Sequence, residues 1–234
     1  MLAGSLAYGR VTLFGPVLQR LFDQLDTHGG PRAFVGRFEP NDRRVFADFR
    51  YRFNDPDDLV QLFSALRLLL ERWGSLGALA ARHHRGPTIQ ASLEGLVSEL
   101  AEAAGPDLTR GTRYWLSRPS GGSACKRWCM VYRWMVRGGD EDVDLGIWPL
   151  PTSALVIPVD THVLRIARML GLTAAKAGSW RVAEQITGRL RELDPEDPVR
   201  FDFALAHLGI SGACAGRADA ELCPVCPLQS CCSG

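Results

Sequence analysis

Apolar residues recur at helical spacing along most of the chain, and this periodicity constrains the fold more than any other feature. One stripe lies on a single helix face and comprises Leu59, Leu62, Phe63, Leu66, Leu70 and Trp73. Asn54 as N-cap, Pro56 in the first turn and Gly74 after the last residue bound this helix. Similar stripes cover residues 11–26, 88–103, 124–137, 160–171, 179–192 and 197–210. No segment of useful length alternates with period two, so we expect an all-α fold of about eight to ten short helices.

Residue types that cap helices predict where several of these helices begin. Ser179 and Asp160 are good N-caps for the stripes that follow them, and Asp194-Pro195 leads into the last stripe. The least helical stretches are 104–123 and 138–158, where we expect functional loops.

Length and composition limit the classes of protein that the chain can represent. Its 234 residues suit one compact domain or two small lobes, and 46% apolar with 23% charged residues excludes a disordered tail protein. No apolar stretch approaches the ~20 residues that span a bilayer. The first ten residues lack the basic region of a signal peptide. We therefore expect a cytoplasmic monomer with no membrane partner.

The net charge of +1 conceals a basic block between residues 110 and 137. This block has a local charge of +7 and no acidic residue, and it contains Arg110, Arg113, Arg118, Lys126, Arg127, Arg133 and Arg137. Such a block inside a nearly neutral protein is typical of a surface that contacts phosphates. A solvated helix face is the alternative interpretation, and composition alone leaves both open.

Five of the seven cysteines lie in the last 21 residues, four of them as Cys214-x₈-Cys223-x₂-Cys226-x₅-Cys232. In a reducing cytoplasm, clustered thiols indicate a metal site before a disulfide. Four thiolates bind either Zn²⁺ or a [4Fe–4S] cluster. Structural zinc sites usually use two closely spaced cysteine pairs, and this tail has one, so the spacing favours the iron–sulfur cluster, with zinc as the alternative. Cys231 competes with Cys232 for the place of the fourth ligand.

Lysine is rare in this chain, because 25 of the 27 basic residues are arginine and only Lys126 and Lys176 are lysine. Lys126 follows the small-residue loop 119–125 and falls in the first turn of a predicted helix. The positive end of the helix dipole disfavours a charged amine there. An uncharged amine is what an imine-forming nucleophile needs, and arginine cannot replace it. A surface lysine at a helix start is the alternative, and Lys176 has no evident role.

Two segments resemble the helix-hairpin-helix DNA glycosylases, the superfamily of endonuclease III and adenine DNA glycosylase. The cysteine tail resembles their iron–sulfur loop, with two extra residues between Cys214 and Cys223. Their Leu-Pro-Gly-x-Gly-x-Lys hairpin is matched in weakened form by Gly122-Ser-Ala-Cys-Lys126, and their Val-Asp-Thr-His closely by residues 159–162. The long separation of Lys126 from Asp160 is similar to that of the archaeal 8-oxoguanine glycosylase branch, which lacks the cluster, so the chain resembles either a hybrid of the two groups or a separate bacterial branch.

The resemblance implies a two-lobed helical glycosylase. One lobe would comprise residues 1–25 and 138–213 beside the cleft, and a barrel lobe would comprise 26–137 and end in the hairpin and the Lys126 helix. Residues 214–232 would form the cluster loop. The implied activity is that of a bifunctional DNA glycosylase and AP lyase in base-excision repair, in which Lys126 attacks C1′ of a damaged nucleotide and Asp160 assists.

The resemblance also implies binding residues and partners. Backbone N–H groups at Gly122 and Ala124 would bind a DNA phosphate, with Arg113, Arg118 and Arg127 nearby. The implied ligands of the [4Fe–4S] cluster are Cys214, Cys223, Cys226 and Cys232. The partner would be double-stranded DNA with a damaged base or an abasic site, in the cytoplasm at the nucleoid.

Two other functions compete with this hypothesis, and one further aromatic residue is a candidate for base contact. A non-catalytic DNA- or RNA-binding protein could keep the hairpin and a structural cluster, and a zinc-stapled helical interaction protein could keep the cysteines. Trp148 in the 138–158 segment is a candidate for stacking on a flipped base, whereas Trp128 falls on an apolar helix face and is expected in the core.

Overall fold

The computed structural model describes residues 1–139, 144–214 and 216–232, and this part of the chain is all-α. Within these ranges there is no strand, and β-type pairing is limited to two isolated bridges, Tyr51 with Asn54 and Gly138 with Leu145. The all-α class predicted from periodicity is confirmed. None of the helices in the described ranges is long and apolar enough to cross a membrane.

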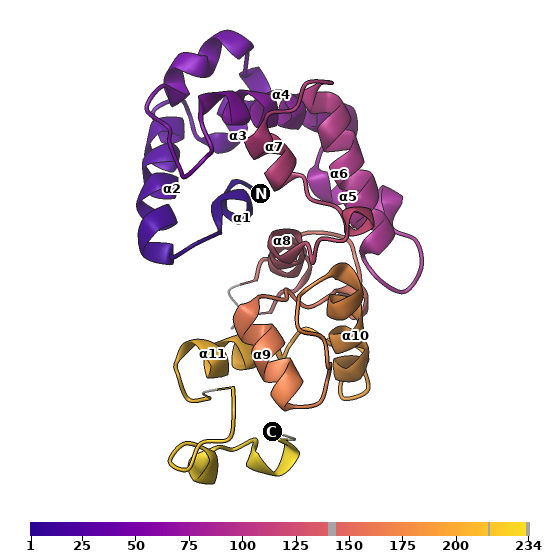
Figure 1. The fold of residues 1–234 in the computed structure, drawn as a ribbon. Helices are drawn as coiled ribbons and strands as arrows, with labels where there is room; N and C mark the ends of the chain where they lie inside the picture. Colours follow the sequence, from indigo (N-terminus) through magenta and orange to yellow (C-terminus); the bar gives the residue numbers. More distant parts are fainter. Residues whose placement is uncertain (140–143, 215, 233–234) are drawn as a thin grey trace. The chain divides into compact units, whose positions relative to one another are not determined.

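The described residues form eleven α-helices and five short 3₁₀ segments (Figure 1). This is more than the periodicity predicted, because four of the helices, α1, α3, α5 and α7, have only five to eight residues. The elements are α1 (Leu2–Leu6), α2 (Val11–Asp26), α3 (Pro31–Arg37), η1 (Pro40–Phe46), α4 (Pro56–Trp73), α5 (Leu76–His83), α6 (Gln90–Ala104), α7 (Arg110–Trp115), η2 (Pro119–Gly121), α8 (Lys126–Val136), η3 (Thr152–Ala154), α9 (Thr161–Met169), α10 (Trp180–Arg191), α11 (Asp202–Ile210), η4 (Cys223–Val225) and η5 (Gln229–Cys231).

The chain divides into two compact units. Unit 1 comprises Met1–His84 and Ala91–Arg118, and unit 2 comprises Arg85–Gln90 and Pro119–Gly234. These bounds differ from the predicted lobes, because residues 1–25 belong with the rest of the N-terminal half and α8 belongs with the C-terminal half. Lys126 and Asp160 therefore lie in the same unit.

Unit 1 is organised around α4, whose N-terminus differs by one residue from the prediction. Asp55, not Asn54, is the N-cap, and its carboxylate accepts hydrogen bonds from the backbone N–H groups of Asp57 and Asp58. Asn54 is buried instead, and its side-chain amide donates to the Asp58 carboxylate. Pro56 at the first helical position and Gly74 after the last residue agree with the sequence.

Four phenylalanines form the centre of the unit 1 core. Their neighbouring ring centroids lie 4.9 to 6.0 Å apart, which is the usual range for packed aromatic side chains. They come from α3, the residue after it, η1 and α4, and each is almost completely buried: Phe34, Phe38, Phe46 and Phe63.

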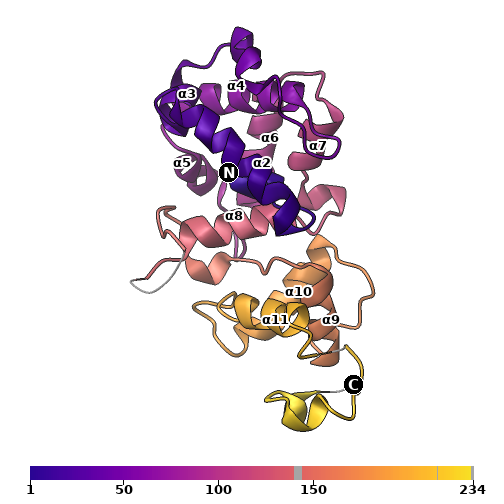
Figure 2. The same cartoon turned by 90° about the vertical axis from the view of Figure 1, so that its left-hand side faces the viewer.

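Unit 2 places α9 against α11, as both views show (Figures 1 and 2). Their contact is close at Gly209, where an added Cβ would lie 2.9 Å from the Cβ of His162. The chain enters α9 through residues 155–159, which follow η3 and are all buried, as is Ala154 at the end of η3. Two hydrogen bonds hold this part of the chain, because Ile89 N–H donates to Ala154 O at 2.9 Å and Ile157 N–H donates to the Thr187 hydroxyl at 3.0 Å.

The capping predictions have mixed outcomes. Asp160 and Ser179 cap α9 and α10 as predicted. Asp194 instead forms a turn by accepting from the N–H groups of residues 196 and 197, and α11 begins only at Asp202. The stretch 104–123, expected to be a loop, contains α7.

Candidate functional site

Lys126 and Asp160 form an ion pair, with 3.1 Å between Lys126 Nζ and Asp160 Oδ2. Both side chains keep partial contact with solvent, 38% exposed for Lys126 and 21% for Asp160. The structure therefore brings together the two residues that the sequence singled out as nucleophile and carboxylate. A pair that remains accessible can meet a ligand from outside.

Asp160 is held firmly at the start of α9. Its Oδ1 accepts hydrogen bonds from the backbone N–H groups of His162 and Val163, at 2.9 and 2.8 Å. The buried segment 154–159 fixes the backbone before it. One carboxylate oxygen thus caps the helix, and the other faces the Lys126 amine.

Lys126 is the first residue of α8 and follows a strained turn. Cys125 adopts a left-handed conformation, with φ of 48°, and its N–H donates to the Ser123 hydroxyl at 3.1 Å. A Cβ added at Gly178 would touch both Ala124 and Val159, at 3.7 and 3.6 Å. Gly178 thus packs between the residue that lies two positions before Lys126 and the residue that precedes Asp160.

The surroundings of Asp160 favour its ionised form. Burial alone would raise the pKa of this carboxyl, but the hydrogen bond from Val163 N–H and the nearby Lys126 ammonium outweigh it, so the pKa is lowered. The site therefore offers a stable negative charge within hydrogen-bond distance of an amine. Such a carboxylate can stabilise a positive charge at Nζ or accept a proton from it.

The basic block at 110–137 is less exposed than its sequence suggests. Arg133 pairs with Asp202 at 2.7 Å and with Asp144 at 3.3 Å, and Arg137 pairs with Asp144 and Asp197, both at 2.9 Å. Both arginines are largely buried. Among the described residues, Lys126, Arg133 and Arg137 are thus paired with carboxylates from outside the block. The +7 charge therefore does not describe one continuous surface.

The residues predicted to contact DNA phosphates lie in both units. Arg113 and Arg118 are exposed on unit 1, where Arg118 also donates to Ser98 at 3.1 Å. Arg127 and Ala124 are partly buried in unit 2. Gly122 is exposed with φ of 75°, and its N–H donates to Pro119 O at 2.8 Å. Its N–H is thus used within the turn, which differs from the phosphate contact that the sequence predicted.

Asp202 is a residue that the sequence reasoning missed. It is buried at the start of α11, and burial raises its pKa despite the Arg133 guanidinium, with the negative charge of Asp160 acting in the same direction. It therefore belongs to the electrostatic environment of the Lys126–Asp160 pair. Asp202 lies 42 residues after Asp160 in the chain, and no local sequence pattern links the two residues.

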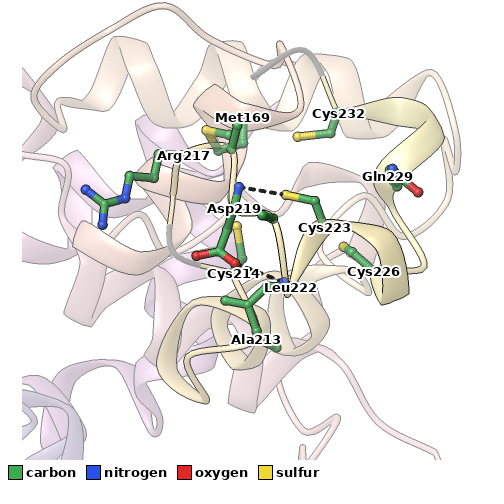
Figure 3. A pocket seen from close by; sticks show the side chains of 12 residues that line it. Met169, Ala213, Cys214, Arg217, Asp219, Leu222, Cys223, Cys226, Gln229 and Cys232 are labelled. Carbon is green, nitrogen blue, oxygen red and sulfur yellow. Dashed lines mark hydrogen bonds between the residues drawn. The ribbon is translucent and has the colours of Figure 1, made fainter.

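The cysteine tail folds around a cavity of about 360 Å³. Its lining includes Cys214, Cys223, Cys226 and Cys232, which Figure 3 shows around the cavity together with Met169. Cys231 is exposed and is not part of the lining. In the described ranges, no three His, Cys, Asp or Glu side chains are grouped in a way that could hold a metal ion. The four cysteines are thus among the residues that line one cavity.

Backbone N–H groups already point at two of these sulfur atoms. Asp219 N–H donates to Cys223 Sγ at 3.2 Å, drawn as a dashed line in Figure 3, and Gly216 N–H donates to Cys214 Sγ at 3.4 Å. Hydrogen bonds of this kind stabilise thiolate ligands of iron–sulfur clusters. Arg165 of α9 anchors the loop, since its Nη2 donates to the carbonyl oxygens of Gly209 at 2.7 Å and Cys214 at 3.4 Å.

Residues 145–148 lie against the end of α8. Leu145 and Trp148 donate their N–H groups to the carbonyls of Trp134 and Met135, at 2.6 and 2.7 Å. Trp148, the predicted stacking residue, packs edge-on against buried Tyr132 with ring centroids 5.0 Å apart. Trp128 is buried, as expected. The acidic residues at 140–142 lie outside the described residues.

Fold and site together define an all-helical protein of two units that carries a partly exposed Lys–Asp pair and a cavity lined by four cysteines. The chain belongs to the family described as "Protein of unknown function (DUF2400)", whose model matches residues 1–211. The match includes Lys126 and Asp160 and ends before Cys214. The comparisons with curated proteins and with solved structures gave no match.

Proposed function

We propose that the protein is a DNA glycosylase with AP lyase activity, in which Lys126 is the nucleophile. The observation that carries this proposal is the 3.1 Å contact between Lys126 Nζ and the ionised Asp160 at the start of two helices. A lysine amine beside a fixed carboxylate can form an imine with an aldehyde or with a sugar C1′. The resemblance of the Lys126 hairpin and of residues 159–162 to helix-hairpin-helix glycosylases supports DNA as the substrate.

The proposed reaction uses the pair in two stages. The Lys126 ammonium first gives a proton to solvent, and its amine then forms a bond to C1′ of a damaged nucleotide as the N-glycosidic bond breaks and the base leaves with its electron pair. A proton moves from the new C1′ nitrogen to O4′ as the C1′–O4′ bond breaks, and the ring opens to a protonated imine, whose positive charge lies beside Asp160. Water takes a C2′ proton as the 3′ phosphate leaves with the C3′–O bonding pair, and a second water then hydrolyses the imine to release Lys126.

The chemistry of the loop residues fits a [4Fe–4S] cluster. Cys214, Cys223, Cys226 and Cys232 would hold it, since all four line one cavity and two of their sulfur atoms already accept backbone N–H groups. When bound, such a cluster would cross-link the loop and stabilise it. Arg165 links this loop to α9, the helix that Asp160 caps.

Strand cleavage at an abasic site tests the proposed activity. The full chain is incubated with a duplex that contains one abasic site, and the products are separated by length. We expect β-elimination products with the wild type and their loss with Lys126→Arg, which keeps the charge but cannot form an imine. Cleavage by both proteins, or by neither, would contradict the proposal and favour a non-catalytic nucleic-acid-binding protein. A panel of duplexes with single lesions then identifies the excised base.

A further inference from the structure

Unit 1 carries a group of aromatic side chains on its surface that the proposed reaction does not use. We call this group the aromatic patch, and it consists of Tyr8, Phe53 and Tyr114. The ring centroids of Tyr8 and Phe53 lie 6.0 Å apart, and both lie 5.1 Å from the ring of Tyr114. Phe53 is 37% exposed and Tyr114 is 41% exposed. Exposed apolar side chains that form a contiguous group mark interaction sites, whereas scattered ones do not.

Two guanidinium groups lie against the rings of the patch. The Arg110 Cζ is 4.8 Å from the centroid of Phe53, and the Arg52 Cζ is 5.6 Å from the centroid of Tyr8. Both arginines are exposed. Arg113, on the same short helix as Arg110, is exposed as well. The patch thus combines flat apolar surfaces with positive charge, and it complements a negatively charged ligand that carries rings.

The backbone beneath Phe53 holds it at the tip of a tight turn. The turn is closed by two hydrogen bonds between Tyr51 and Asn54, N–H to O at 3.1 Å and at 2.8 Å. Arg52 at its tip has φ of 55°, a left-handed conformation that is rare and strained for a residue other than glycine. Strain of this kind persists only where the surrounding structure fixes the backbone. Here it places Arg52 over Tyr8 and leaves Phe53 at the surface.

A buried polar network fixes the three segments of the patch to one another. The Tyr8 hydroxyl donates to the side-chain oxygen of Asn54, and the amide of Asn54 donates to Asp58 at 2.8 Å. The hydroxyl of Thr109, which caps α7, donates to the other oxygen of Asp58. Because α7 carries Arg110 and Tyr114, the Asp58 carboxylate ties the whole patch together. The patch is preorganised, which lowers the entropic cost of binding.

We propose that the aromatic patch binds unpaired bases of single-stranded DNA. Exposed rings stack on nucleobases of any sequence, and flanking guanidinium groups contact the phosphates between them. A duplex hides the faces of its bases, so the patch selects strands that are unpaired. This goes beyond the proposed function, because the binding would exist even if Lys126 performed no chemistry.

Fluorescence anisotropy with a labelled oligothymidylate tests the proposal on the full chain. We expect Phe53→Leu and Tyr114→Leu each to weaken binding about tenfold, because each removes one stacking ring. Phe203→Leu is the matched control, since Phe203 is 62% exposed on α11 in unit 2, and it should change affinity less than twofold. Thermal unfolding shows whether each variant is folded. Wild-type affinity in folded Phe53→Leu and Tyr114→Leu would overturn the proposal.

A second ligand separates stacking from charge attraction. A strand of the same length whose central nucleotides are tetrahydrofuran spacers keeps the phosphates but has no bases there, and it cannot form an imine with Lys126. We expect the wild type to bind this strand at least tenfold more weakly than the oligothymidylate. Arg110→Gln should reduce the slope of log affinity against log salt by about 0.7. Equal affinity for the two strands would overturn the proposal without bearing on the lyase activity.

Discussion

Lys126 Nζ lies 3.1 Å from Asp160 Oδ2, although 34 positions separate the two residues in the chain. Lys126 is the first residue of α8, and Asp160 is the N-cap of α9, so the starts of two helices meet at this pair. Helix N-termini carry partial positive charge. The start of α9 stabilises the negative charge of the Asp160 carboxylate, which in turn faces the Lys126 amine.

The two functions of Asp160 can be separated by substitution. Asparagine keeps the oxygen that caps α9, so Asp160→Asn should lower the free energy of unfolding by less than about 1 kcal/mol. Asp160→Ala loses the cap and should cost about 0.5–2 kcal/mol. Both remove the charge beside Lys126 and should slow abasic-site cleavage about 100-fold or more. Urea unfolding and cleavage rates check these values, and unchanged cleavage in Asp160→Asn would show that the carboxylate has no catalytic part.

The lowered pKa of Asp160 predicts a pH dependence of stability. Because the folded state favours the ionised form, the stabilisation is fully present above the unfolded-state pKa of about 3.9 and is lost as pH falls through the lower folded-state pKa. The difference in unfolding free energy between wild type and Asp160→Asn should therefore be constant from pH 5 to 7, and it should shrink below about pH 4. Urea unfolding at several pH values measures it. A difference that grows on acidification would contradict the lowered pKa.

Local signals in the sequence predicted part of this structure. Asp160 and Ser179 were recognisable as caps because a capping side chain bonds only to the next turn. The sequence does not distinguish Asn54 from Asp55 as the N-cap, because both residue types cap well, whereas in the structure the side-chain oxygen of Asn54 accepts a long-range hydrogen bond from the Tyr8 hydroxyl.

Contacts between segments that are far apart in the chain could not be predicted from local sequence patterns. The carboxylates that neutralise Arg133 and Arg137 lie up to 69 residues away in the chain. The local sequence therefore predicts these arginines to be surface charges, although the structure pairs them. The Lys126–Asp160 contact was expected only from the resemblance to a family, since no spacing rule brings these residues together. Asp202 was not predicted either, because only the fold brings it near Lys126 and Asp160.

The cavity in the cysteine loop predicts which of two adjacent cysteines is a ligand. Cys232 lines the cavity, whereas Cys231 is exposed outside it. Cys232→Ser should lower the iron content and the absorbance near ~400 nm, and Cys231→Ser should leave both close to wild type. Elemental analysis for iron and zinc decides the metal at the same time. Loss of metal in Cys231→Ser alone would reverse the assignment.

The attachment of this loop to α9 depends on a glycine. A Cβ at Gly216 would lie 2.2 Å from Arg165 Cδ, so Gly216→Ala should displace Arg165 and release bound metal to a chelator several-fold faster than wild type. Gly212→Ala is the matched control, because Gly212 also has a positive φ but has open space around its Cα. It should retain metal and cost about 1 kcal/mol in backbone strain. Equal metal release from both variants would show that the Arg165 contact does not anchor the loop.

Gly111 packs against the polar network of unit 1, where a larger side chain would not fit. A Cβ at Gly111 would lie 2.0 Å from Asp58 Oδ2 and 2.1 Å from Asn54 Nδ2, so Gly111→Ala should destabilise the protein by about 3 kcal/mol. Gly15→Ala, inside α2 with open space around it, should instead stabilise by about 0.5–1 kcal/mol. Urea unfolding of the two variants gives both values. A small effect of Gly111→Ala would mean that the network is not tightly packed.

The central claim is that Lys126 forms a covalent imine with DNA, and borohydride trapping tests it most directly. Wild-type protein is mixed with abasic-site duplex and reduced, and the cross-linked peptide is mapped by mass spectrometry. The account predicts one adduct, on Lys126, which is absent in Lys126→Ala and unaffected by Lys176→Ala. No adduct with the wild type, or the same adduct in Lys126→Ala, would contradict it.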